Sequence, residues 1–177
     1  MTDEEIIAHD LQKAAYHEAG HLVALHALGG EGNIELIYHS DTTNLRKNSA
    51  YTGKVHIFRN VEGESLRIMA LCGVASELLM LDPEATGDDL MFDFETEEQS
   101  ETDREFAEGY TDETAEAAID LLRQHWGAVQ QIAEYKIVQE TTNRSAEPDN
   151  ELFEKHYRAI QKLDLYHPKT PQQRHSQ

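Results

Sequence analysis

An H-E-x-x-H motif at residues 17–21 lies within a stretch of helical periodicity. Residues four positions apart share one face of an α-helix, so both imidazoles can reach a single metal ion. A helix is expected over residues 3–28, because Thr2 and Glu5 have capping-box spacing and Gly29-Gly30 supplies a stop. The motif therefore predicts a helix near the start of the fold, and a break near Asp10 stays open.

The residue types in this motif indicate zinc chemistry. Zinc accepts imidazole nitrogen, and a catalytic zinc keeps one position open for water. We expect His17 and His21 to be zinc ligands and Glu18 to be the general base that accepts a proton from the attacking water. A polar stripe on a surface helix would give the same letters, but small or apolar neighbours surround the pair: Ala15, Ala19, Leu22 and Val23.

Glycine positions indicate close helix packing. Gly20 lies in mid-helix, where glycine costs about 1 kcal/mol relative to alanine, so a neighbouring group is expected to approach the backbone there. A largely buried helix is expected over 64–81, where the Cys72-Gly73 pair offers a low-profile face. The single cysteine cannot form an internal disulfide and is expected to be a buried small hydrophobe.

The remaining pattern is mainly α-helical with a small β-hairpin. Residues 33–38 and 51–58 alternate and are rich in β-branched and aromatic residues, which predicts two strands joined by a long loop. Residues 82–103 hold ten acidic residues and no Lys or Arg, which favours a mobile, solvated loop. Later helices are expected at about 100–108, at about 112–140, and after a cap at Asp149. We expect one domain over 1–167 and a polar, disordered tail over 168–177.

Charge and composition exclude several partners. The net charge of −19 argues against binding to nucleic acid and to anionic membranes, which require clustered Lys and Arg. No stretch approaches the roughly 18–20 apolar residues of a membrane span. The acidic N-terminus lacks the features of a signal peptide, so a cytoplasmic protein is expected.

Three segments resemble the FtsH-type peptidases, the proteolytic half of membrane-anchored ATP-dependent proteases. The first is AYHEAGHLVALHAL, which resembles the zinc-site helix of that family. Two others are similar to the glycine-alanine-glutamate helix and to the late helix of the family: LCGVASELL and EAAIDLLRQHWGAVQQIAEYKI. The resemblance covers roughly residues 8–163. It implies a mostly helical peptidase domain, a hairpin near the zinc site, and an aspartate from a downstream helix as third ligand.

The chain departs from that family in two respects. It contains no G-x-x-x-x-G-K-[ST] phosphate loop and no transmembrane segment, so ATP-driven unfolding of substrates is not expected of this chain itself. A separate ATPase partner and a homo-oligomer both stay open.

Three residues compete for the role of third zinc ligand. Asp103 is favoured, because it begins a short helix with Ser100 placed as its cap. Asp89 follows a threonine-glycine pair that resembles the family's lead-in, but no clear helical pattern follows it. Glu77 is a further alternative, since some other zinc peptidases take a glutamate from a second helix.

The expected function is an ATP-independent zinc metalloendopeptidase that cuts peptides or unfolded protein segments. The alternative is a non-catalytic zinc-binding module for interaction or regulation, derived from such a peptidase. The presence of Glu18 favours the enzyme, because a purely structural zinc site does not need a base. A zinc hydrolase acting on a non-peptide amide would have the same motif.

Overall fold

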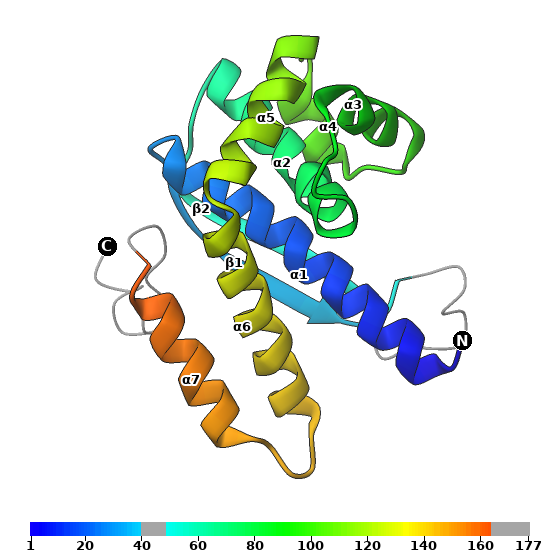
Figure 1. Cartoon of the computed structure of the whole chain (residues 1–177), viewed down its shortest axis with the longest axis vertical. Helices are drawn as coiled ribbons and strands as arrows, with labels where there is room; N and C mark the ends of the chain where they lie inside the picture. Colours follow the sequence, from blue (N-terminus) through cyan, green and yellow to red (C-terminus); the bar gives the residue numbers. More distant parts are fainter. Residues whose placement is uncertain (40–48, 164–177) are drawn as a thin grey trace.

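A long N-terminal helix, α1 (Asp3–Ala27), runs through the middle of the fold (Figure 1). The computed structural model describes residues 1–39 and 49–163. Thr2 caps α1: its hydroxyl accepts from the backbone N–H of Glu5, and the Glu5 carboxylate accepts from the N–H of Thr2. The predicted helix and its capping box are therefore confirmed.

The two strands form an antiparallel pair, β1 (Glu31–Tyr38) and β2 (Tyr51–Arg59), which packs against α1. Tyr38 lies opposite Tyr51, at the end of the hairpin that leads into the connecting loop. The prediction of a small hairpin beside helices is confirmed. Residues 40–48 of the predicted loop lie outside the described part of the chain.

Helix α2 (Glu64–Leu81) matches the predicted range and packs along α1. A Cβ at Gly20 would collide with the carbonyl oxygen of Cys72 and lie 2.5 Å from Cβ of Ser76. The close approach that Gly20 predicted is thus confirmed, with α2 as the neighbour. Cys72 is fully buried, as expected, and burial raises the pKa of its thiol.

The prediction of a mobile loop over 82–103 is wrong. This segment contains helix α3 (Gly87–Thr96) and the start of helix α4 (Glu101–Ala107), the second of which was expected. Thr86 and Asp89 form a capping box at the start of α3, and Leu90 and Phe94 bury their side chains one turn apart. Burial of this apolar pair outweighs charge repulsion, because most of the acidic side chains point into solvent.

The single helix predicted over 112–140 is two helices, α5 (Asp112–Gln124) and α6 (Trp126–Arg144). The chain leaves helical geometry at His125, with φ −113° and ψ 20°. Because of the break, the two parts of the apolar stripe pack against different helices: α5 packs on α2 and α3, whereas α6 packs on α1. Six residues of the predicted stripe are buried, on both sides of the break: Ala118, Ile119, Leu122, Val129, Ile132 and Ala133. Trp126, the seventh, is half-buried at the start of α6.

Helix α7 (Asn150–Gln161) returns along α6, and the two project together from one end of the molecule (Figure 1). The Asp149 carboxylate accepts from the backbone N–H of Leu152, which confirms the predicted cap. Residues 164–167 of the predicted domain and the predicted tail over 168–177 lie outside the described residues. Within residues 1–39 and 49–163, no helix has both the length and the apolar character to cross a bilayer.

Candidate metal centre

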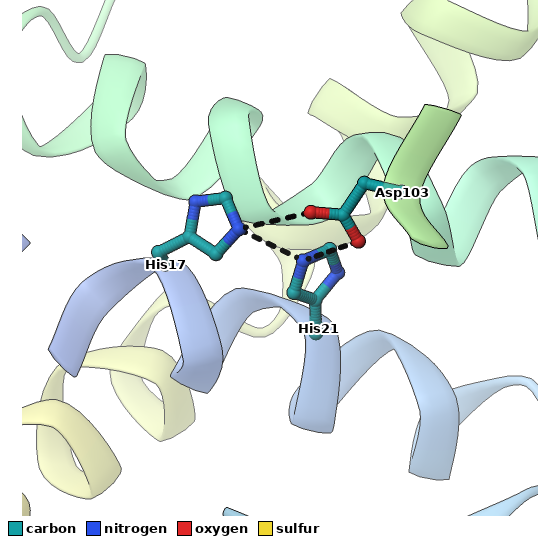
Figure 2. Close-up of side chains that lie close together, drawn as sticks. All are labelled: His17, His21 and Asp103. Carbon is teal, nitrogen blue, oxygen red and sulfur yellow. Dashed lines mark hydrogen bonds and ion pairs between the residues drawn. The ribbon is translucent and has the colours of Figure 1, made fainter. Parts of the chain in front are cut away.

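Helices α1 and α4 bring three metal-ligating side chains together. His17 and His21 lie one turn apart on α1, and both imidazoles point toward the carboxylate of Asp103 in the first turn of α4 (Figure 2). The Nε2 atoms of the two histidines are 3.0 Å apart. Oxygen atoms of Asp103 lie 3.4 Å from Nε2 of His17 and 3.3 Å from Nε2 of His21.

These separations fit a tetrahedral zinc site. Ligand atoms that bind zinc at about 2.0–2.1 Å in tetrahedral geometry lie about 3.3 Å from one another. The distance between the two Nε2 atoms and the distances from His17 to Oδ2 and from His21 to Oδ1 of Asp103 are all close to that value. The side chains are 5–18% exposed, so water competes little. Three protein ligands leave the fourth position for water or substrate, as in catalytic zinc sites.

The outer nitrogen of each imidazole is held in place by a second partner. Nδ1 of His17 lies 2.5 Å from Oε1 of Glu77, and Nδ1 of His21 lies 2.9 Å from the carbonyl oxygen of Met69. Both partners are acceptors, so each imidazole in its neutral form carries its proton on Nδ1 and presents a lone pair at Nε2. Two lone pairs and a carboxylate therefore face one another, and only a cation between them, proton or metal, removes their repulsion.

The electrostatics of the cluster agree with this arrangement. Burial lowers the pKa of His17, but hydrogen bonds to Asp103 and Glu77 outweigh it and raise the pKa well above 6.5. Burial likewise lowers the pKa of His21, but the charge of Asp103, its hydrogen bond to the ring and the charge of Glu18 together raise the pKa above its ordinary value. Burial raises the pKa of Asp103, yet the two histidines together hold it well below its ordinary value.

The three candidates for third ligand have separate positions. Of the described residues, only Asp103 joins His17 and His21 in a group that can hold one metal ion. Asp89 is exposed, and its carboxylate accepts from the backbone N–H of Thr86 in the capping box of α3. Glu77 bonds to the far side of the His17 ring, so it orients a ligand instead of completing the triad. Sequence reasoning weighed Glu77 only as a ligand; the need of each imidazole for an Nδ1 partner is the signal that suggests this other role.

Glu18 lies between the metal-ligating face of α1 and strand β2. It is buried, and its side chain stands against the backbone at Gly53. Burial raises the pKa of Glu18, although His17 and His21 nearby act to lower it. The structure thus places the expected base beside the expected ligands, with its carboxylate in the gap between helix and sheet.

The cluster opens into a cavity of about 570 Å³ between α1, β2 and the segment before α4. Its lining includes the three candidate ligands, Glu18, and consecutive residues of β2 from Tyr51 to Val55. A volume of this size is ordinary for a ligand-binding site and is sufficient for a short peptide segment.

No protein-family model and no curated protein matches this chain. The resemblance to FtsH-type peptidases therefore remains a prediction from its motifs.

Replacement of Glu77 by alanine is expected to lower zinc affinity by about 10–100-fold, the usual effect of removing the partner of a ligating histidine. Without Glu77, the His17 ring loses the acceptor that holds its tautomer and orientation. Competition with a chromophoric chelator measures the affinity. Glu84→Ala, which removes an exposed carboxylate, is the matched control. Unchanged affinity in Glu77→Ala would contradict the orienting role.

Proposed function

We propose that this chain is a zinc-dependent peptidase in which His17, His21 and Asp103 hold the metal and Glu18 is the general base. The observation that carries the proposal is the convergence of three side chains, in which the two Nε2 atoms lie 3.0 Å apart and each lies 3.3–3.4 Å from an oxygen of Asp103, beside a buried glutamate and at the edge of a cavity. A structural zinc site is usually closed by four protein ligands, often cysteines, and the only cysteine of the sequence is buried elsewhere.

The chemistry divides between the metal and the protein. Bound zinc supplies Lewis acidity, which polarises a carbonyl and acidifies water. Glu18 accepts a proton from the water that attacks the carbonyl carbon and delivers it to the leaving nitrogen, so that hydrolysis yields a carboxylate and an amine. Its buried position beside β2 limits the directions in which its carboxylate can point.

Strand β2 supports a peptide as the substrate. In the two-stranded sheet of the described residues, β2 pairs with β1 along one edge, and its residues line the cavity. An extended peptide can bond to the other edge as an added strand, which would align its backbone beside the metal. This geometry favours flexible or unfolded protein segments, because the segment must extend along β2 and enter the cavity at the same time.

Membership of the FtsH-type family is part of the same proposal. The resembling segments fall on α1, on α2 and on α5–α6, and the hairpin borders the cavity, as the resemblance implies. A cytoplasmic location, a homo-oligomer and a separate ATPase partner stay predictions.

Metal analysis combined with proteolysis tests the function. The full chain is expected to bind about one zinc and to degrade an unfolded casein-type substrate; a chelator should abolish cleavage and added zinc should restore it. The doubly substituted variant His17→Ala, His21→Ala should lose both zinc and cleavage. One bound zinc with no cleavage of peptides or unfolded proteins would favour the non-catalytic module instead.

A further inference from the structure

Helix α2 passes the candidate metal centre at a glycine. A Cβ built on Gly73 would lie within 2.5 Å of Nε2 of both His17 and His21. Zinc bound to both nitrogens would lie about 2.0–2.1 Å from each. A methyl group at position 73 would therefore compete with the metal for nearly the same space.

The imidazoles cannot swing aside freely to accommodate that methyl group. Glu77 and the carbonyl of Met69 hold their Nδ1 atoms, and both rings are largely buried. Movement away from α2 would break one of these hydrogen bonds or separate the Nε2 atoms. Backbone conformation does not explain the glycine, because Gly73 has no positive φ and lies in a regular helix.

Strand β2 passes Glu18 at a second glycine. A Cβ on Gly53 would collide with the Glu18 side chain and would come within 2.6 Å of its carboxyl carbon. Gly53 also lacks a positive φ, so alanine would fit its backbone. Unlike the imidazoles, Glu18 has a flexible chain and can rotate away, at the cost of its position.

We propose that Gly73 and Gly53 are positioning residues: Gly73 keeps the metal position free of protein atoms, and Gly53 keeps the place of the Glu18 carboxylate free. This inference rests on the proposed function. It assigns different consequences to the two glycines, since one protects metal binding and the other protects the geometry of the base.

Zinc affinity tests the first part. Gly73→Ala is expected to lower affinity by more than about 100-fold, beyond the usual effect of disturbing a ligand through its surroundings. Gly127→Ala is the matched control, because Gly127 is also helical and a Cβ there meets no atom within 4 Å. Wild-type affinity in a folded Gly73→Ala chain would overturn this part.

If Gly73→Ala does not fold, the same substitution is tested in a chain that lacks both histidines. The same substitution is made together with His17→Ala and His21→Ala, which remove both rings from the space that the new methyl group needs. Restored folding, measured by circular dichroism and melting temperature, supports a conflict with the imidazoles. Failure to fold in both backgrounds would show that Gly73 serves only helix packing and would overturn the proposal for it.

Kinetics and stability test the second part. Gly53→Ala is expected to retain zinc and KM while kcat falls by about 100-fold, the order of loss when a catalytic group is displaced by about 1 Å. Any decrease in its melting temperature should disappear in a Glu18→Ala background, where the colliding atoms are absent. Unchanged kcat, or an equal decrease in melting temperature in both backgrounds, would overturn this part.

The wild-type chain separates failure of the inference from failure of the function. If the wild type binds zinc and cleaves an unfolded substrate while both glycine variants match Gly127→Ala, only the inference is wrong. If the wild type binds no zinc, the proposed function fails and the inference falls with it.

Discussion

Replacement of Glu18 by glutamine is expected to lower the rate of peptide hydrolysis by about 10²–10⁴-fold, the usual contribution of an acid-base group. Glutamine has almost the same size, so it should fit the same gap beside Gly53. Its amide cannot accept the proton of the attacking water. The substituted chain should nevertheless retain zinc, because Glu18 lies outside the group of three ligand atoms. Initial rates and zinc content, measured on the same preparation, give both quantities.

The matched control for this experiment is Glu113→Gln, which makes the same chemical change at an exposed position in the first turn of α5. It should leave both the rate and the zinc content unchanged. Undiminished hydrolysis in Glu18→Gln would exclude Glu18 as the base. Loss of zinc in that variant would instead make Glu18 part of the binding site.

Replacement of Asp103 by asparagine is expected to weaken zinc binding by more than about 100-fold, a larger effect than that of a residue which only orients a ligand. The Asp103 carboxylate contributes the only negative charge among the three converging groups, and one of its oxygens faces each histidine. A neutral amide is a poorer ligand for zinc. Competition with a chromophoric chelator at constant pH measures the difference.

Asp89→Asn is the matched control, because it makes the same chemical change at the competing candidate for third ligand. Asp89 is exposed and serves as the capping partner of α3, so its substitution should leave zinc affinity at the wild-type value. Loss of affinity in Asp89→Asn, with Asp103→Asn behaving as wild type, would transfer the ligand role to Asp89. Loss in neither variant would point to Glu77 or to a residue from a neighbouring chain.

Local features of the chain were predictable from the sequence because they depend on neighbouring residues. The capping box of Thr2 and Glu5 and the cap at Asp149 follow from hydrogen bonds within one turn. The range of α2 follows from its apolar run and from the proline that comes directly after Asp82. Periodicity also predicted the buried stripe that continues through α5 and α6. It did not reveal the break at His125, because that break follows from packing against different helices.

The sequence by itself determined that two histidines and a glutamate share one helix, since spacing along α1 decides which residues lie on one face. It left three carboxylates as candidates for the third ligand, because their distances from α1 depend on how distant helices pack. The tertiary structure placed Asp103 against both Nε2 atoms, Glu77 against Nδ1 of His17, and Asp89 in solvent. It also decided which glycines face the site. Contacts between residues 30 to 90 positions apart arise only when the core forms, and no local pattern encodes them.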